Sequence, residues 1–304
     1  GLVVSLIALP LSLGLAMASD APPIAGVITS IVGGIVVAVF GGSYVTISGP
    51  GKGLVGVVLV AVSTLGLTTT YAAIICSGVL LLILGFLRLG KLADYFPSSA
   101  IQGVLAAIGL IILGKQFHIM LGNKIVKDST IDYLIAIPET IMNVFQYQDA
   151  GLINAAIAGV LSLIIMVFYS KIRNKYLQLI PAPMWIVICS IGLSYYCEFI
   201  LKIPNPISEK YMIPNIPSLT DVMSDLPVPN FKAIHTLEFW GSVVALTLIA
   251  SIESLLSIKA VDKLDPMKRR SNVNKDVKAL GVATAVSGLL GGLNVVTVIA
   301  PSSV

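Results

Sequence analysis

The segment GGSYVTISGP (residues 41–50) recurs, with one inserted residue, as GGLNVVTVIAP (residues 291–301). Each copy follows a short glycine-rich apolar stretch, contains a run of β-branched residues and ends in proline. β-Branched residues favour extended backbone, and proline lacks the N–H that a continuing helix needs. The two copies therefore predict two apolar segments that are extended in part and broken at Pro50 and Pro301.

The surrounding sequence is typical of a protein embedded in a lipid bilayer. Of its 304 residues, 56% are hydrophobic and only 11% are charged, and the mean hydropathy is +0.96. A helix needs about 20 apolar residues to span a bilayer, and long stretches here contain no charged residue. We expect spans at residues 2–18, 24–40, 45–64 (broken), 70–87, 98–121, 150–170, 181–200, 239–260 and 279–293, and a second broken span from 295 onward.

The order of these spans predicts an inverted repeat. The two broken segments lie seven spans apart, and an odd number turns the second copy upside down relative to the first. Most of the 19 Lys and Arg residues fall in the loops at 88–91, 171–175 and 259–278. The positive-inside rule then places the N-terminus in the cytoplasm, and this rule accounts for the basic loops without a nucleic-acid partner.

The remaining segments and single residues have simpler interpretations. Segment 129–147 is amphipathic and contains Pro138, so we expect an interrupted interfacial helix, whereas the proline-rich segment 201–237 predicts an extracellular loop. His118, at the end of a span, is expected to be an interfacial anchor. Because the chain begins with Gly1 and stops inside an apolar run at Val304, we expect it to be a fragment cut at both ends.

Broken spans suggest an anion site. A helix that begins inside the membrane leaves its first N–H groups unpaired and carries about half a positive charge at that end. Two such ends facing each other would bind a halide or an oxyanion. The alternative is a pair of ordinary proline kinks packed by small residues. The glycines that would let the backbone approach the anion closely are Gly49, Gly51 and Gly53. The hydroxyl donors would be Thr46, Ser48, Ser302 and Ser303.

Glu253 lies near the middle of the apolar segment 239–260. An unpaired carboxylate there costs at least a few kcal/mol, so Glu253 is expected to face a polar cavity. Three roles fit this position: a ligand for a coupling cation, a proton-coupling carboxylate, and a structural carboxylate hydrogen-bonded to a half-helix.

Several motifs resemble those of the SulP anion permeases, a family related to the SLC26 transporters. The resemblance extends over the whole chain and is most specific in its second half. The matching motifs are Ala8-Leu9-Pro10-Leu11, Ala16-Met17-Ala18-Ser19, Ile47-Ser48-Gly49-Pro50, Tyr95-Phe96-Pro97-Ser98-Ser99, Ser251-Ile252-Glu253-Ser254-Leu255-Leu256-Ser257, Ala260-Val261-Asp262-Lys263-Leu264-Asp265-Pro266 and Ser287-Gly288-Leu289-Leu290-Gly291-Gly292.

The resemblance implies an all-α polytopic fold of fourteen spans in two inverted sets of seven, often followed by a soluble STAS domain, and usually a homodimer. This chain would contain about ten of those spans. A core domain would comprise residues 1–95 and the truncated second repeat at 238–304, and a gate domain residues 96–200, with the extracellular loop at 201–237. Transport of a small inorganic anion, sulfate or bicarbonate, across a bacterial inner membrane is the expected function, without an enzymatic reaction or a cofactor.

The resemblance also assigns candidate site residues. It places a sodium or proton coupling site at Glu253, Ser257 and Thr297, which offer oxygen ligands suited to a hard cation. Relatives often have arginine where Pro301 stands, and we hypothesise that Lys52 supplies that charge here; the alternative is that Lys52 snorkels or pairs with an acid. The candidate substrate-binding residues are Ser48, Gly49, Pro50, Gly51, Lys52, Ala300, Pro301, Ser302 and Ser303.

Two rival functions use other parts of the sequence. A nucleobase transporter of the same architecture is the first. The second is a membrane enzyme of the prenyl-transfer type, in which Asp262 and Asp265 would hold Mg²⁺ and pyrophosphate. Such an enzyme needs a second Asp-rich loop, and the other cytoplasmic loops offer only Asp94.

Overall fold

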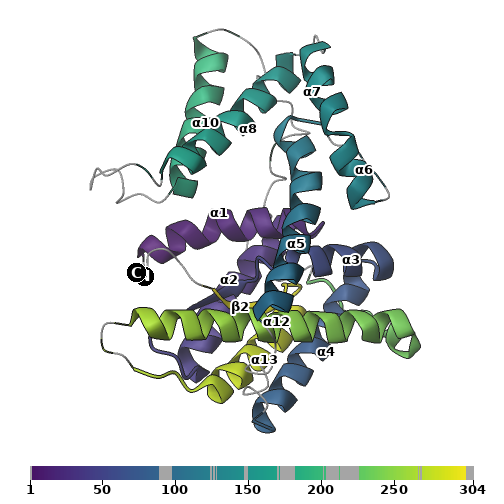
Figure 1. The fold of residues 1–304 in the computed structure, drawn as a ribbon, viewed down its shortest axis with the longest axis vertical. Helices are drawn as coiled ribbons and strands as arrows, with labels where there is room; N and C mark the ends of the chain where they lie inside the picture. The colour runs from purple at the N-terminus through teal and green to yellow at the C-terminus, as the bar shows by residue number, and fades with distance from the viewer. Residues whose placement is uncertain are drawn as a thin grey trace. The chain divides into compact units, whose positions relative to one another are not determined.

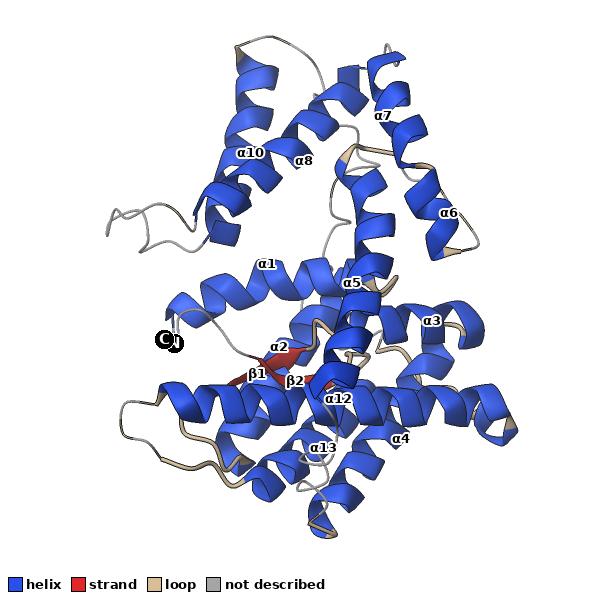
Figure 2. Ribbon diagram, in the orientation of Figure 1, coloured by secondary structure: helices blue, strands red, loops and turns tan. Residues whose placement is uncertain are grey.

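The computed structural model describes residues 2–88, 98–123, 125, 127, 129–146, 150–169, 171, 182–200, 202, 212, 226–265, 267 and 269–298. These residues fold almost entirely as helices, with two short strands between them (Figures 1 and 2). The elements are α1 (Leu2–Ala18), α2 (Pro23–Phe40), β1 (Ile47–Pro50), α3 (Val55–Leu65), α4 (Leu67–Phe86), α5 (Ser98–Met120), α6 (Thr130–Ile135), α7 (Ile137–Gln146), α8 (Ala150–Tyr169), α10 (Ala182–Phe199), the 3-10 helix η3 (Lys232–His235), α12 (Leu237–Leu264), α13 (Val273–Leu289) and β2 (Val295–Val298).

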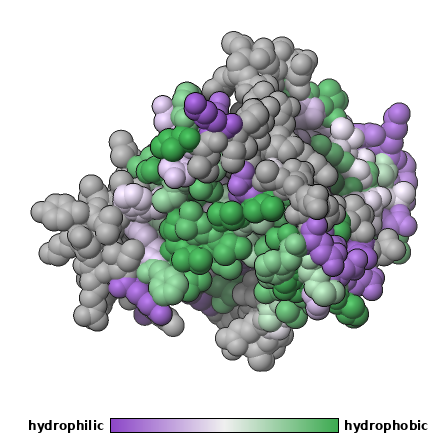
Figure 3. All heavy atoms as spheres, turned by 90° about the horizontal axis from the view of Figure 1, so that it is seen from above, coloured by the Kyte–Doolittle hydropathy of each residue, from purple (hydrophilic) through white to green (hydrophobic). Residues whose placement is uncertain are grey.

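The predicted membrane character is confirmed. Within the described part of the chain, α2, α4, α8, α10 and α12 are long and apolar enough to cross a bilayer, and α1, α3 and the end of α5 are shorter apolar helices. Large apolar side chains of α8 such as Leu163 and Met166 are half exposed, which suits contact with lipid. Figure 3 shows apolar residues forming a broad patch on the face in view.

The chain divides into two compact units. Residues 1–10 and 109–215 form one unit, which contains α6, α7, α8 and α10. Residues 11–108 and 216–304 form the other, which contains both strands together with α2, α3, α4, α12 and α13. The second unit therefore brings the two copies of the repeated segment into one structure.

The repeated segments are extended, as the sequence predicts, and they pair with each other. β1 and β2 form a two-stranded antiparallel sheet in which Ser48 lies opposite Thr297 and Pro50 opposite Val295 (Figure 2). Copies related by a two-fold axis in the membrane plane must run in opposite directions, so antiparallel pairing is the arrangement that an inverted repeat requires.

Hydroxyl groups from neighbouring helices satisfy the backbone of the second strand. Thr284 Oγ1 on α13 accepts from the N–H of Val295 and donates to its carbonyl, both at 3.2 Å. Thr29 Oγ1 on α2 accepts from the N–H of Leu293 at 2.6 Å, and Ser287 Oγ donates to the Leu293 carbonyl at 2.7 Å. Backbone groups left unpaired in an apolar interior cost free energy comparable to a lost hydrogen bond, so these hydroxyls stabilise the extended backbone.

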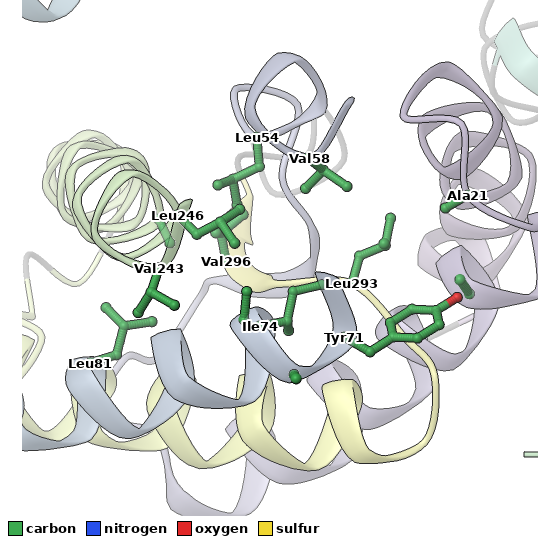
Figure 4. Packing of buried hydrophobic residues seen from close by; sticks show 14 of the residues in the cluster. Ala21, Leu54, Val58, Tyr71, Ile74, Leu81, Val243, Leu246, Leu293 and Val296 are labelled. Carbon is green, nitrogen blue, oxygen red and sulfur yellow. The ribbon is translucent and has the colours of Figure 1, made fainter. Parts of the chain in front are cut away.

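The apolar core lies against the strands and the helix that follows β1. In Figure 4, Leu54 and Val296 lie near Leu246 of α12, while Leu293 lies beside Ile74 of α4. Each of these side chains is at least nine-tenths buried. The position of β2 is therefore fixed by packing as well as by hydrogen bonds.

Charged groups at one end of this unit join the α12–α13 loop to the segment after α2. The Asp276 carboxylate accepts the N–H groups of Gly42, at 2.6 Å, and Ser43, at 3.1 Å. Arg269 pairs with Asp265 at 2.9 Å and lies 4.6 Å from the centre of the Tyr44 ring. Hydrogen bonding from the Arg269 guanidinium lowers the pKa of Asp265 to about 2, so this pair stays charged at neutral pH.

Two expectations need correction. The interfacial segment is interrupted at Ala136, between α6 and α7, rather than at Pro138. Pro138 lies in the first turn of α7, where a missing N–H costs no helix hydrogen bond. His118, expected to be an interfacial anchor, is buried within the protein: it is 1% exposed, and its ring nitrogens contact Thr140 Oγ1 at 2.7 Å and the Tyr133 carbonyl at 2.8 Å.

Close contact between α4 and α13 depends on glycines on both helices. A Cβ at Gly281 would lie 2.6 Å from the backbone N of Leu82, and one at Gly78 would lie 2.5 Å from the backbone N of Ala285. Backbone atoms cannot move aside as a flexible side chain can. These two helices therefore accept no larger residue at their crossing without separating.

We predict that Gly281→Ala lowers the stability of the full-length protein in detergent by about 1–3 kcal/mol, because overpacking forces backbone shifts. Thermal unfolding followed by tryptophan fluorescence measures the change. The control is Gly241→Ala on α12, where a Cβ meets no atom within 4 Å. Alanine is the better helix former, so the control should be neutral or stabilising. Equal destabilisation of both variants would contradict the packing argument.

Candidate functional site

The chain passes from β1 into α3 through Gly51, Lys52 and Gly53. The N-cap position of α3, Leu54, makes no side-chain hydrogen bond, so the N–H groups at this helix end need another partner. The N–H of Gly53 donates to Glu253 Oε1 at 3.2 Å. A carboxylate from the middle of α12 therefore lies at the N-terminal end of the half-helix, where the helix dipole favours negative charge.

The second carboxylate oxygen of Glu253 is buried and makes no hydrogen bond within the described part of the chain. It lies against Gly51, where a Cβ would come within 2.7 Å of Glu253 Oε2 and within 2.7 Å of Val296 Cγ2. Only glycine lets the backbone approach the carboxylate this closely. A buried acceptor with no partner indicates a place for a proton, a cation or a hydrogen-bond donor.

Ser48 provides a second polar atom of this kind on β1. Its side chain is 8% exposed, and its hydroxyl has no hydrogen-bond partner among the described residues. Across the sheet, the N–H of Thr297 donates to Ser254 Oγ on α12 at 3.2 Å, one residue after Glu253. The central part of α12 is thus joined to β2 by Ser254 and to the start of α3 by Glu253.

A small cavity adjoins the end of β1. It has a volume of about 10 Å³, which is roughly the space that one water molecule needs. Asn294, which is 1% exposed, donates from Nδ2 to Ser77 Oγ at 3.1 Å, and its Oδ1 has no partner in the described residues. An oxyanion requires this space to widen. The lining residues are Leu15, Ser19, Pro50, Gly51, Leu54, Val55, Val58, Leu293 and Asn294.

Lys52 directly precedes Gly53, whose N–H bonds the carboxylate. Its side chain is exposed, and its charge is close enough to interact with Glu253. Among the described residues, Lys52 and Glu253 do not form an ion pair. The geometry is compatible with both roles expected for Lys52: attraction of an anion, and compensation of Glu253.

The structure places the expected site residues as follows. Ser48, Gly49 and Pro50 lie on β1, Gly51 and Lys52 follow it, and Thr297 lies on β2 opposite Ser48. Ser257, 8% exposed, lies one turn after Glu253 on α12. Ala300, Pro301, Ser302 and Ser303 lie outside the described residues, so the second half-helix remains a prediction.

Sequence reasoning missed Asn294, Ser254 and the hydroxyl groups that hold β2. Asn294 lies in the repeated segment at residues 291–301, but the sequence suggested no role for it. An amide side chain within a β-branched apolar run was the available signal, because a polar group there must find a partner.

A sodium ion would find part of a site here. Glu253 Oε2 offers a charged oxygen with no protein partner, and hard cations bind such oxygens. Within the residues that the structure describes, no group of three or more His, Cys, Asp or Glu side chains could hold a metal ion.

The chain resembles known proteins along its whole length. The model of the sulfate permease family matches residues 1–304. A putative sulfate transporter of Bacillus subtilis, YvdB, is 25% identical over 299 residues, covering 96% of this chain and 52% of the relative. The bicarbonate transporter BicA of Picosynechococcus sp. is 25% identical over 303 residues, covering 96% of this chain and 50% of the relative.

Solved structures agree on the fold. The transmembrane domain of a cyanobacterial bicarbonate transporter BicA superposes with a TM-score of 0.77 at 22% identity, covering 98% of this chain and 72% of that chain. The chain spans about half the length of the curated relatives it matches. It is an integral membrane protein with the inverted-repeat transporter fold, and it belongs to the sulfate permease family, whose members are transporters and not enzymes.

Proposed function

We propose that this chain forms most of the membrane domain of a secondary transporter that moves a small inorganic oxyanion, sulfate or bicarbonate, by alternating access. The relatives named as sulfate and bicarbonate transporters support the substrate class. The small cavity at the end of β1, where Ser19 and Asn294 lie among apolar side chains, supports a site for a small solute. A nucleobase carrier and a prenyl-transfer enzyme have no comparable support in the described residues.

The position of Glu253 carries the mechanistic part of the proposal. The half-helix end that would attract an anion already holds a protein carboxylate at 3.2 Å from the Gly53 N–H. A second negative charge close to it, shielded from water, would be strongly repelled. We infer that a cation, sodium or a proton, neutralises Glu253 whenever the anion binds. Cation and anion would therefore cross the membrane together.

The role of each expected residue follows from this arrangement. Ser48 and the backbone of Gly49, Pro50 and Gly51 would contact the anion, with Ala300, Pro301, Ser302 and Ser303 completing the site from the other half-helix. Glu253, Ser257 and Thr297 would hold the cation. Lys52, which is exposed just before the N-terminal end of α3, would attract anions and raise their local concentration.

We further propose that residues 1–95 and 238–304 form the core domain and residues 96–200 the gate domain of an alternating-access cycle, within a homodimer. A division into two compact units supports this proposal, although residues 1–10 group with 109–215 and residues 98–108 with the unit that contains the strands. The ends of α2 and α4, the α12–α13 loop and the start of α13 lie together at one end of their unit. These segments carry many of the basic residues, which supports a cytoplasmic location for that end and for the N-terminus, in a bacterial inner membrane.

Glu253→Gln should abolish the dependence of anion uptake on the coupling cation. The amide carries no negative charge, so the repulsion that requires a cation is gone. Uptake of radiolabelled sulfate and bicarbonate is measured in proteoliposomes of the full-length protein, with sodium varied at fixed pH and pH varied at fixed sodium. Wild-type uptake should rise about tenfold or more with one of the two cations.

The matched control is Glu238→Gln, an exposed acid in the first turn of the same helix, which should behave as wild type. Persistence of the wild-type cation dependence in Glu253→Gln would exclude Glu253 as the coupling group.

A second test distinguishes displacement of the Glu253 carboxylate from the general effect of replacing a glycine by alanine. Gly51→Ala should lower uptake roughly tenfold or more, because a Cβ displaces the Glu253 carboxylate and overpacking of about 1–3 kcal/mol is enough for that loss. Gly34→Ala on α2 is the control, since its Cβ would meet no atom within 4 Å. Equal uptake by the two variants would show that Gly51 does not position the carboxylate.

A further inference from the structure

A basic cavity lies away from the β1–β2 site, where α4 ends and α13 begins. Its volume is about 860 Å³. The two helices lie side by side in the same compact unit (Figure 1). This space is much larger than the cavity beside β1 and is large enough for a charged organic group. Its lining residues are Gly85, Phe86, Arg88, Asn272, Asn274, Lys275 and Lys278.

The charged residues that line this cavity within the described part of the chain are all cations: Arg88, Lys275 and Lys278. Among the described residues, none of these three cations forms an ion pair. The neighbouring acids are held elsewhere: Asp276 accepts from the N–H groups of Gly42 and Ser43, and Asp262 from the N–H and hydroxyl of Ser271. Three cations around one space repel each other unless an anion lies between them.

Two further features favour an anion in this cavity. Asn272 caps α13 by accepting the N–H of Lys275, so the positive end of the α13 dipole lies at the cavity wall. The Lys278 ammonium lies 5.1 Å from the centre of the Phe86 ring, and a Cβ on Gly85 would lie 2.5 Å from Lys278 Cγ. The stem of Lys278 is therefore held against the end of α4, and the position of its charge is restricted.

An apolar stripe on α4 leads to the cavity. Val79, Ile83, Phe86 and Leu87 are 45–66% exposed and lie at helical spacing on one face of an apolar helix long enough to span the bilayer. Exposed apolar side chains on such a helix contact acyl chains. The apolar stripe therefore ends at a cluster of cations, and this combination matches the two parts of an anionic phospholipid.

We propose that this cavity binds the phosphate-bearing headgroup of an anionic phospholipid, whose acyl chains lie along the exposed face of α4. The phosphate oxygens accept from Arg88, Lys275 and Lys278, while Phe86 contacts the apolar part of the lipid. Free phosphate shares the headgroup chemistry but makes no use of the apolar stripe. The lipid should therefore bind more tightly than inorganic phosphate does.

The test measures lipid retention. Full-length protein is purified in detergent, mixed with phosphatidylglycerol or with phosphatidylcholine, and examined by native mass spectrometry. Wild type should retain phosphatidylglycerol in preference to phosphatidylcholine. The triple variant Arg88→Gln, Lys275→Gln, Lys278→Gln should bind phosphatidylglycerol roughly a hundredfold more weakly, since each basic side chain near an anionic lipid contributes roughly fivefold.

Three cations outside the cavity provide a control with the same change in net charge: Lys171→Gln, Lys232→Gln and Arg270→Gln. This variant should retain phosphatidylglycerol as wild type does. The double variant Arg88→Gln, Lys275→Gln leaves the Lys278–Phe86 packing intact and should bind roughly 25-fold more weakly on the same basis. It tests the proposal even where the triple variant does not fold.

Competition with inorganic phosphate distinguishes a lipid ligand from free phosphate. If millimolar phosphate fails to displace phosphatidylglycerol from wild type, the lipid is the ligand. Complete displacement by phosphate, or equal retention of phosphatidylglycerol by the wild-type protein and the double variant, would overturn the proposal.

Discussion

The structure of the second compact unit depends on one constraint: peptide groups that leave helical geometry inside an apolar core must still be hydrogen-bonded. β1 and β2 meet that constraint by pairing with each other in antiparallel register. Hydroxyl groups from α2, α12 and α13 bond β2 or Leu293, two residues before it; they belong to Thr29, Ser254, Thr284 and Ser287. Open sheet edges are not tolerated in lipid, so the two broken spans are stable only when helices cover them.

This constraint also determines where the chemistry occurs. A span that becomes extended must restart as a helix, and its first N–H groups are exposed at that point. In this chain the carboxyl group of Glu253 on α12 occupies the position and accepts the N–H of Gly53. In the proposed mechanism an anion binds once Glu253 is neutralised, and coupling to a cation would follow from electrostatics. The narrow cavity beside Asn294 adds a second requirement, because the unit must open before an oxyanion fits.

The repeat around Pro50 and Pro301 was enough to predict two extended breaks and their inverted relation, because proline and β-branched residues act locally. The cost of a carboxylate in an apolar span similarly identified Glu253. The sequence did not predict that the two copies pair or that Ser48 lies opposite Thr297, because local residue preferences do not specify which distant strand a strand pairs with. Asn294 and Ser254 were missed because short polar residues also pack helices in membranes. A hydrogen bond from a half-helix was one of three roles considered for Glu253, and the structure identified the Gly53 N–H as the donor.

Disulfide crosslinking tests the central pairing most directly. Cys76, Cys189 and Cys197 are first replaced by serine in the full-length protein, and cysteines are then introduced at Ser48 and Thr297. Directly opposed strand residues have Cα atoms about 4.5–5.5 Å apart, within disulfide range, whereas positions offset by two are about 7–8 Å apart. The pairing predicts rapid oxidation of Ser48→Cys with Thr297→Cys and little crosslinking of Ser48→Cys with Val295→Cys. Equal or faster crosslinking of the offset pair would contradict the register on which the site depends.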